Sequence, residues 1–396
     1  MNKYKEGLRS NIWKYYIFEF LWSAVFFFPI FQLYYIARGM TITQIAFIGI
    51  AFNVSRMFIE IPSGVLADKW GRKKTLFLSQ LLFIIDMAIL TFAHSFWLYI
   101  VAAIVSGAWI ACYSGTAVAF FYDTLVELKR EKEYEKLWGR FSLIGSAVTF
   151  TTSLVAGYLF NISITLPYIL TGISAFLSLF VILSFTEPRF HKSAEEDTIL
   201  LHFKKSMLTV IKNENISFIV FFGAIFGFAL NYLFNYGQVY LVSIGIPITF
   251  FGLIFAVRSI VEGLGATYAN KIKNLFSYRT ILTSTLLFAT IIIFGLSYIN
   301  NYIGAFVFII SFFIVGMFRI LQRGYIHKRI SSHNRATVDS VSSFSIAIFA
   351  IIFEPIAGKI ADMYSIQTSF FILGCILLAY SLYYLLFKLP KDQLFY

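Results

Sequence analysis

Residues 64–74 read Gly-Val-Leu-Ala-Asp-Lys-Trp-Gly-Arg-Lys-Lys, a short polar turn that separates two long apolar stretches. Apolar stretches of this kind recur along the chain. Of its 396 residues 59% are hydrophobic and 13% are charged, and the mean hydropathy is +0.77. Soluble domains have about 45–50% apolar and about 25% charged residues. The composition therefore excludes an ordinary cytosolic enzyme, a disordered regulator and a disulfide-stapled secreted scaffold.

The apolar stretches are long enough to cross a bilayer, whose core of about 30 Å needs about 20 helical residues. The basic N-terminus precedes an apolar stretch without a small-residue cleavage site, which indicates a first span and not a removable signal peptide. The pattern predicts an all-α integral membrane protein with twelve transmembrane helices. The expected spans are 12–36, 42–66, 73–93, 95–125, 137–161, 165–186, 216–243, 247–270, 277–297, 301–325, 335–361 and 365–388.

One long polar stretch, residues 187–215, divides the spans six plus six. It separates an N-terminal six-helix bundle, residues 1–186, from a C-terminal six-helix bundle, residues 216–396. Within it, six apolar residues share one helical face, which predicts a short amphipathic helix in a cytoplasmic central loop. That helix lies either on the inner membrane surface or against the bundle. The apolar positions are Ile199, Leu200, Phe203, Met207, Val210 and Ile211.

The formal net charge of +12 is distributed unevenly. Lys and Arg gather in the cytoplasmic loops of membrane proteins. If both termini lie inside, 27 of the 32 lysine and arginine residues fall on the cytoplasmic side. Arg38 and Lys359 fall outside, and Arg56, Arg258 and Arg319 fall within spans. The positive charge thus sets the topology in the lipid bilayer, and no nucleic-acid partner is expected.

The two halves share a charge pattern. Each has an arginine and a glutamate four residues apart on one helical face, followed by a polar turn. An offset of 202 residues relates the two copies, and it places Asn270 where the first half has Asp68. Internal repeats recur in transporters, so we interpret the chain as a duplicated six-helix unit. The paired residues are Arg56 with Glu60 and Arg258 with Glu262.

The turn at 64–74 resembles the hallmark loop between the second and third spans of the major facilitator superfamily. Residues 60–64 and the segment from Ser114 to Asp123 further resemble a bacterial group of members that includes drug exporters. The resemblance implies two six-helix bundles around a central cavity that opens alternately to either side. It also implies a multi-pass protein of the bacterial inner (plasma) membrane.

The hallmark loop supplies the gating candidates, which are Gly64, Asp68, Gly71, Arg72 and Asp123. The two glycines are expected to permit close helix approach and a tight turn. We expect Asp68 and the cations after Gly71 to form an ion-pair network, with Asp123 as a partner of Arg72. In the family this loop stabilises the outward-open state. The alternative is that the cations only fix topology, above all the two lysines that follow Arg72.

Eight charged side chains lie deep within the predicted spans, away from the span ends, where charge is costly and marks functional candidates. The Arg–Glu pairs either hold helices in register or bind protons, and a neighbouring arginine opposes proton binding. Glu19 and Asp86 have no basic residue within four positions. Glu19 lies in a span that lines the cavity in the family, so it is our first candidate for the coupling proton and Asp86 the second. The eight are Glu19, Arg56, Glu60, Asp86, Arg258, Glu262, Arg319 and Glu354.

The seventh span has three amides at positions i, i+4 and i+7, flanked by tyrosines. Three amides on one face are not expected to contact lipid. They either line a substrate cavity or join two helices by hydrogen bonds. Two aromatic residues of the first half are candidates for the same cavity. The cavity candidates are Asn231, Tyr232, Asn235, Tyr236, Gln238, Phe26 and Tyr113.

The sequence has no nucleotide-binding loop, nucleophile elbow or cluster of metal ligands, so no enzyme activity, cofactor or metal is expected. We predict a monomeric secondary active transporter that couples protons to the export of amphipathic small molecules or drugs. The fifth span carries Gly145 and Gly157, but it lacks the proline that drug exporters of the resembled family carry in this span. The direction of transport is therefore left open. An uptake symporter for a small nutrient is the alternative in the same fold. An uncoupled sensor or lipid scramblase is the alternative of another class.

Overall fold

The computed structural model describes residues 3–189, 214–327 and 335–387, and these form helices without a strand. The elements of the first half are α1 (Lys3–Trp22), η1 (Phe28–Ile30), α2 (Phe31–Ala37), α3 (Ile42–Trp70), α4 (Arg72–Phe92), α5 (Phe96–Glu127), η2 (Glu131–Glu133), α6 (Tyr134–Ile162) and α7 (Leu166–Ser184). Those of the second half are α9 (Glu214–Ser243), η3 (Ile248–Phe250), α10 (Phe251–Leu275), α11 (Tyr278–Tyr298), α12 (Ile303–His327), α13 (Arg335–Met363) and α14 (Ile366–Phe387).

Eleven of the described helices are long and apolar enough to cross a membrane. The chain is therefore a multi-span membrane protein, and its helices are consistent with the twelve expected spans. The expected first span, 12–36, is not one continuous helix. Helix α1 ends at Trp22, and the chain continues through the 3-10 turn η1 into the short helix α2. Pro29 lies in the first turn of η1, where its missing N–H costs no helical hydrogen bond, so it favours a new helical start after the break.

The chain divides into two compact units. The first consists of Met1–Met40 and Phe47–Glu196, and the second of Thr41–Ala46 and Asp197–Tyr396. The first turn of α3 belongs to the second unit through Asp362, near the end of α13. Its carboxylate accepts hydrogen bonds from the backbone N–H groups of Ile42 and Thr43, at 2.7 and 2.9 Å. A carboxylate at this position satisfies amides that have no partner within the helix.

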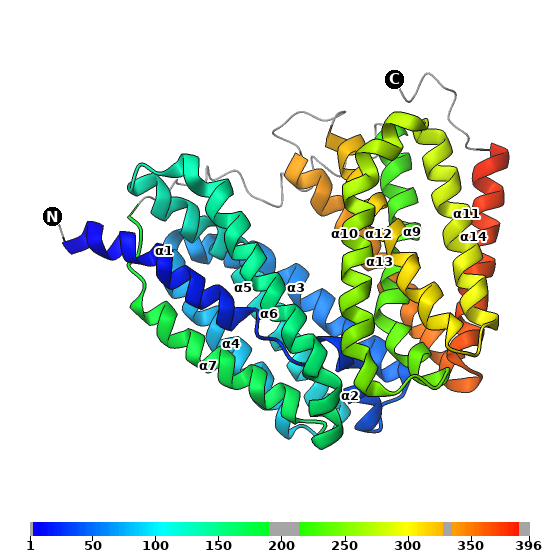
Figure 1. The fold of residues 1–396 in the computed structure, drawn as a ribbon, viewed down its shortest axis with the longest axis horizontal. Helices are drawn as coiled ribbons and strands as arrows, with labels where there is room; N and C mark the ends of the chain where they lie inside the picture. The colour runs from blue at the N-terminus through cyan, green and yellow to red at the C-terminus, as the bar shows by residue number, and fades with distance from the viewer. Residues whose placement is uncertain (1–2, 190–213, 328–334, 388–396) are drawn as a thin grey trace. The chain divides into compact units, whose positions relative to one another are not determined.

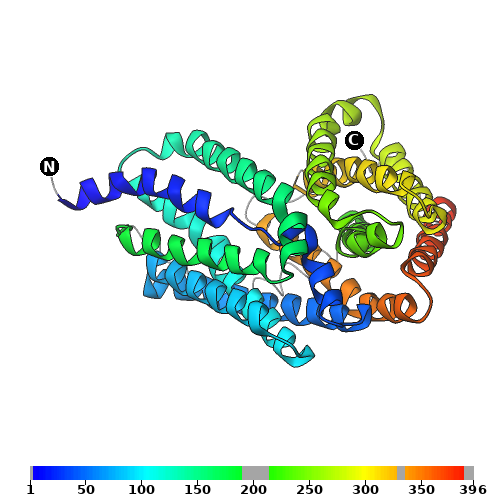
Figure 2. The same cartoon turned by 60° about the horizontal axis from the view of Figure 1, so that its bottom comes forward.

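Helix α4 is central to the first unit, where it packs against α5 and α7, while α1 packs against α6 and α7 (Figures 1 and 2). An aromatic core lies between α1 and α5. It includes Tyr15 and Phe18 of α1 and Phe121 of α5, all fully buried. Helix α3 approaches α5 through small residues. Ser55 donates a hydrogen bond to the carbonyl of Ile104, at 2.6 Å. Small residues of this kind allow helices in membranes to pack closely.

The second unit pairs α9 with α13, α10 with α12, and α11 with α14. The closest approach is between α10 and α12. A Cβ on Gly265 would collide with the backbone of Phe313, and a Cβ on Gly316 would collide with the backbone of Glu262. The two glycines are therefore required by the contact, and they fix the position of the charged residues nearby.

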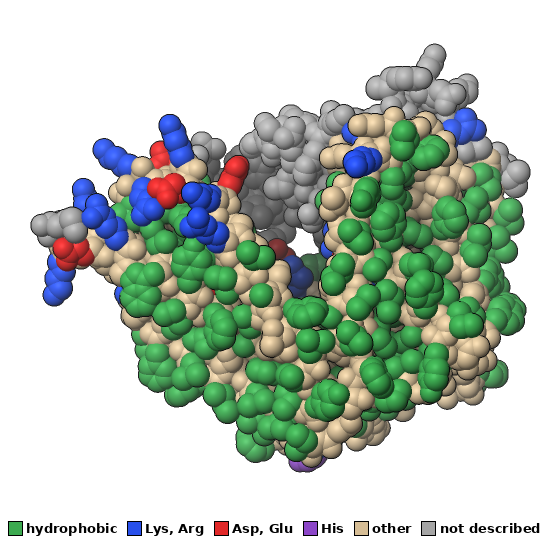
Figure 3. Space-filling model, viewed as in Figure 1, with side chains coloured by type: hydrophobic (Ala, Val, Ile, Leu, Met, Phe, Trp, Pro, Cys, Tyr) green, Lys and Arg blue, Asp and Glu red, His purple; other side chains and the backbone are tan. Residues whose placement is uncertain are grey.

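The outer faces of the helices carry hydrophobic side chains, and charged side chains gather at the end of the first unit where α1 begins (Figure 3). Phe92, Trp97 and Leu143 are each more than 70% exposed. Such large apolar surfaces are expected where the solvent is lipid. The amphipathic helix predicted within 187–215 lies outside the described residues.

Candidate functional site

The chain turns from α3 into α4 at Gly71. This glycine has φ +110° and ψ 147°, in the region that favours glycine because it has no Cβ. The expected tight turn is confirmed. The close helix approach expected at Gly64 is not seen in the described part of the chain, where a Cβ on Gly64 would meet nothing within 4 Å.

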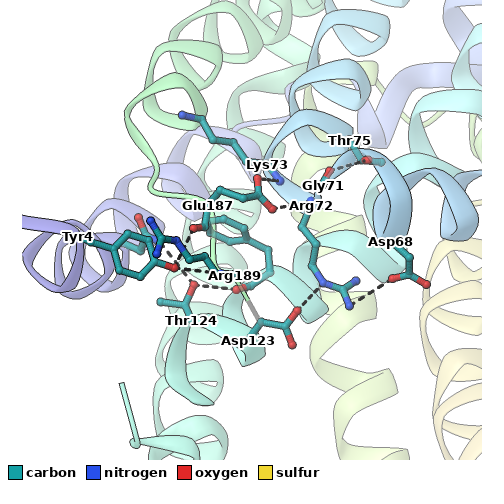
Figure 4. Close-up of polar contacts among 12 residues, drawn as sticks. Tyr4, Asp68, Gly71, Arg72, Lys73, Thr75, Asp123, Thr124, Glu187 and Arg189 are labelled. Carbon is teal, nitrogen blue, oxygen red and sulfur yellow. Dashed lines mark hydrogen bonds and ion pairs between the residues drawn. The ribbon is translucent and has the colours of Figure 1, made fainter. Parts of the chain in front are cut away.

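Arg72, at the start of α4, connects three helices of the first unit (Figure 4). Its Nε lies 2.5 Å from Oδ2 of Asp123, near the end of α5, and its Nη2 lies 3.4 Å from Oδ1 of Asp68, in the last turn of α3. The side chains of Arg72 and Asp123 are only 13% and 8% exposed. The expected partner of Arg72 is thus confirmed. Removing one partner of a buried ion pair leaves the other charge uncompensated.

Glu187 caps the same helix from the chain segment that follows α7. Its Oε1 accepts a hydrogen bond from the backbone N–H of Arg72, and its Oε2 one from that of Lys73, both at 2.8 Å (Figure 4). The first amides of a helix have no partner within it, and a negative charge is favourable there. The Lys73 ammonium in turn donates to the carbonyl of Leu183, at 2.8 Å. The start of α4 and the end of α7 are therefore bonded in both directions.

Tyr4 joins this group from the start of α1. Its hydroxyl donates to Oε2 of Glu127, at 2.6 Å, and lies 3.2 Å from the carbonyl oxygen of Glu187. The backbone N–H of Arg189 donates to the same hydroxyl, at 3.0 Å, and the Arg189 guanidinium lies 4.4 Å from the centre of the Tyr4 ring. Burial, followed by the hydrogen bond to Glu127, raises the pKa of Tyr4 to about 12. The phenol thus remains a hydrogen-bond donor at neutral pH.

Asn11 completes the attachment of the segment after α7. Its amide donates to the carbonyl of Thr186, at 2.8 Å, and its Oδ1 accepts from the backbone N–H of Thr186, at 2.9 Å. Asn11 is fully buried, so both halves of its amide are used. We call residues 186–189, the last described residues before α9, the linker anchor.

Glu19 lies in α1, within the stretch expected to be the first span, and is half-buried. Its carboxylate accepts a hydrogen bond from Ser23, at 3.2 Å. Helix α6 contacts it at Gly145, where a Cβ would lie 2.6 Å from the Glu19 Oε1. Among the described residues no salt bridge to Glu19 is present. The expected isolation of this carboxyl from basic groups is thus seen in the first unit.

Asp86 is more deeply buried, at 1% exposure. Its Oδ2 accepts hydrogen bonds from Ser106 and from the Trp109 indole, the latter at 2.9 Å. Both donors belong to α5, so this carboxyl joins α4 to α5. Its Oδ1 is buried and has no hydrogen-bond partner among the described residues.

The two Arg–Glu pairs differ. In the first unit Arg56 and Glu60 are both exposed, and the described residues form no salt bridge between them. In the second unit Arg258 lies 3.6 Å from Glu262, and Arg319 of α12 lies 2.9 Å from the other oxygen of the same carboxylate. The structure therefore adds Arg319 to the second pair, a contact that the spacing within one helix does not reveal.

The polar residues of α9 have different surroundings. Asn231 is exposed, Asn235 is half-buried and hydrogen-bonds to the buried Glu354 of α13, and Gln238 is fully buried. Tyr232 and Tyr236 are buried in the second unit, where the Tyr232 hydroxyl lies 2.5 Å from that of Ser369 in α14. These tyrosines contribute to helix packing, and their place in a substrate cavity stays a prediction.

The two aromatic candidates of the first half are half-buried. Tyr113 stacks on Trp22, with ring centres 3.7 Å apart. The backbone N–H of Phe26 donates to the Thr171 hydroxyl, at 3.0 Å. Both belong to the first unit, whereas the α9 candidates belong to the second. No group of metal-ligating side chains occurs in the three described ranges.

Sequence reasoning missed Tyr4, Asn11 and Glu187. A signal was available for Glu187, because an acidic residue directly follows the sixth apolar stretch and is expected on the same side as the 64–74 turn. No comparable signal marks Tyr4 or Asn11, whose partners lie more than 100 residues away along the chain.

Residues 16–353 match the model of the Major Facilitator Superfamily. The uncharacterized MFS-type transporter YxaM of Bacillus subtilis (strain 168) is 27% identical over 241 residues, which span 58% of this chain and 58% of YxaM. The quinolone resistance protein NorA of Staphylococcus aureus (strain COL) is 22% identical over 282 residues, 69% of each chain. The crystal structure of the nucleoside transporter NupG covers 97% of this chain and 98% of its own, with a TM-score of 0.77 at 15% identity. That last likeness is one of fold.

Proposed function

Because the chain belongs to the Major Facilitator Superfamily, we propose that it is a secondary active transporter that exchanges protons for amphipathic small molecules and exports them. The observation that carries the proposal is the surroundings of Glu19. This carboxyl is half-buried in α1, within the expected first span 12–36, and lies beside Ser23 and Gly145, without a salt bridge among the described residues. It can take up and release a proton without breaking an ion pair.

Glu19 is preferred to Asp86 because of what each carboxyl contacts. Asp86 is nearly inaccessible and its hydrogen bonds join α4 to α5. Protonation there would disturb helix packing. Glu19 accepts one hydrogen bond, from Ser23 directly after its own helix, and retains partial exposure. Proton exchange at Glu19 therefore leaves the packing of the first unit intact.

The group around Arg72 is proposed as the gating element. Asp68, Arg72 and Asp123 join α3, α4 and α5 within the first unit, and the linker anchor is bonded to the same helix start through Glu187. We propose that transport proceeds by rocking of the two bundles about a central cavity. We also propose a bacterial plasma membrane location with both termini in the cytoplasm, as the distribution of lysine and arginine favours.

Export is favoured by the similarity to NorA, a protein named for quinolone resistance. Uptake of a small nutrient by proton symport remains the second candidate, because the fifth span has Gly145 and Gly157 without the proline of the exporter pattern. A proton-coupled exporter accumulates its substrate in the compartment that is acidic. A proton symporter accumulates its substrate in the compartment that is alkaline.

Transport by the purified protein in liposomes tests the proposal. A panel of amphipathic compounds is offered with an imposed pH gradient of either sign, and protein orientation is determined by protease accessibility of the termini. An exporter accumulates substrate in vesicles whose interior corresponds to the cell exterior and is acidic. Accumulation with the opposite polarity supports the symporter. Gradient-independent flux of every active compound contradicts both and favours an uncoupled protein.

A further inference from the structure

The charged and aromatic group around Arg258 has no part in the proton step described above. We infer that Arg258 and Arg319 of the second unit recognise an anionic group, a carboxylate or sulfonate, on an aromatic substrate. This inference rests on the proposed function, since it names the class of molecule that the transporter carries.

The charges around Glu262 are not balanced. Glu262 is placed between two guanidinium groups, with its Oε2 3.6 Å from Nη2 of Arg258 and its Oε1 2.9 Å from Nη1 of Arg319. A single carboxylate thus faces two cations within the described part of the second unit. Charge inside a membrane is costly unless it is paired. An incoming anion would balance the surplus cation, and an incoming cation would be repelled.

The Arg258 guanidinium has incomplete hydrogen bonding. This residue is only 7% exposed, and its Nε is buried with no acceptor among the described residues. The 3.6 Å separation from Glu262 is longer than a charge-assisted hydrogen bond, which measures about 2.7–2.9 Å. The remaining bond, from Nη2 to the hydroxyl of Ser259, is 3.4 Å long. The guanidinium therefore retains hydrogen-bonding capacity for another acceptor.

Aromatic rings surround the same guanidinium. It lies 4.8 Å from the ring centre of Phe234, 5.5 Å from that of Phe255 and 4.5 Å from that of Phe312. These rings come from α9, α10 and α12, so three helices supply them. Aromatic faces stabilise a guanidinium when it is desolvated. Phe255 and Phe312 are buried, so of these three rings the half-buried Phe234 offers the apolar surface on which an aromatic substrate can pack.

Arg319, unlike Arg258, is exposed. Its side chain is 59% exposed although it lies within the apolar stretch Ile303–Gln322 of α12. Arg319 lies three residues before the end of this stretch, and its ion pair to Glu262 directs it toward α10, so we assign its exposed guanidinium to a water-filled space and not to lipid. Its planar fork can bind a carboxylate or sulfonate through two parallel hydrogen bonds. Arg319 is thus the group that first meets the anion.

The close contact of α10 with α12 holds these groups in place. Gly316 packs against the backbone of Glu262, three residues before Arg319. Since the helices cannot separate there without losing this contact, Arg258 and Arg319 remain at a fixed spacing. A preorganised pair of donors loses little entropy when an anion binds.

Calorimetric titration of the purified full-length protein in detergent tests the inference with three probes of similar size. These are naphthoate, naphthylmethanol and naphthylmethylammonium, each also titrated into micelles alone. We expect naphthoate to bind more tightly than the other two. Arg319→Met and Arg258→Met should each weaken naphthoate binding by about tenfold or more. Lys271→Met, which removes an exposed cation of α10, should leave it unchanged.

Glu262→Gln separates recognition from a structural ion pair. If Glu262 competes with the substrate for Arg319, this variant binds naphthoate several-fold more tightly, which misfolding cannot mimic. The inference is overturned if Glu262→Gln weakens binding as Arg319→Met does, or if naphthylmethylammonium or naphthylmethanol binds to the wild type at least as tightly as naphthoate. Failure of pH-driven transport with naphthoate binding in the expected order would contradict the proposed function and leave this site standing. Proton-driven transport of cationic compounds alone would do the reverse.

Discussion

Arg72 Nε lies 2.5 Å from Oδ2 of Asp123, which joins the start of α4 to the end of α5 across 51 residues of sequence. Both side chains are largely buried, so solvent screens this ion pair less than it would screen a pair at the surface. We expect Asp123→Asn to leave the guanidinium with the longer contact to Asp68, at 3.4 Å, and to cost about 1–3 kcal/mol of stability. The measurement is thermal unfolding in detergent, together with the rate of transport.

Two further variants make this prediction specific. Arg72→Lys keeps the charge and loses the planar fork, so we expect an intermediate effect. Lys74→Gln, at an exposed position two residues further along, should change neither the melting temperature nor the rate. Equal effects of Lys74→Gln and Asp123→Asn would indicate that positive charge as such, and not the ion pair, is what the loop requires.

Glu187 is expected to stabilise the first turn of α4. Its two carboxylate oxygens accept from the amides of Arg72 and Lys73, each at 2.8 Å. Replacing a capping side chain by alanine costs about 0.5–2 kcal/mol. Hydrogen exchange of the peptide that contains residues 72–75 should therefore be faster in Glu187→Ala, and less so in Glu187→Gln. Unchanged exchange in Glu187→Ala would show that the cap is dispensable.

Tyr4 provides a prediction about pH. Its pKa of about 12 in the folded protein lies above the ordinary value of about 10, so folding favours the protonated phenol. The contribution of Tyr4 to stability is fully present below pH 10 and is lost as the pH rises from about 10 to about 12. The difference in tyrosinate absorbance between wild type and Tyr4→Phe should titrate near pH 12. A difference that titrates near pH 10 would mean that the hydroxyl is neither buried nor hydrogen-bonded to Glu127.

The contact between α10 and α12 predicts a contrast between two glycines. A Cβ on Gly316 collides with the backbone of Glu262, whereas a Cβ on Gly263 meets nothing within 4 Å. Overpacking of this kind costs about 1–3 kcal/mol. Gly316→Ala should therefore lower the melting temperature, and Gly263→Ala should leave it unchanged or raise it, because alanine favours helix. Equal melting temperatures of the two variants would contradict the close packing.

The sequence predicts the helices well because the length and apolarity of each stretch depend only on neighbouring residues. The exception is the first span, where the helix breaks after Trp22 within a stretch whose hydropathy is continuous. The tight turn at Gly71 and the partner of Arg72 were also predictable, since both belong to a recognisable loop.

The contacts between helices could not be predicted in the same way. The spacing of Arg258 and Glu262 places them on one face, but nothing in α10 shows that Arg319 of α12 contacts the same carboxylate. Likewise the matching pair Arg56 and Glu60 has the same spacing and no salt bridge in the described structure. Helix periodicity gives the direction of a side chain, and only the packing of the helices decides what it meets.

The central claim is that Glu19 carries the coupling proton, and the most direct measurement is pH-driven transport by Glu19→Gln in liposomes. Glutamine is nearly the same size as glutamate and can still accept the Ser23 hydrogen bond, but it does not titrate. We predict that Glu19→Gln loses accumulation driven by a pH gradient and retains energy-independent exchange of substrate. Glu6→Gln, the matched control at an exposed position of the same helix, should retain both. Undiminished pH-driven accumulation by Glu19→Gln would contradict the account.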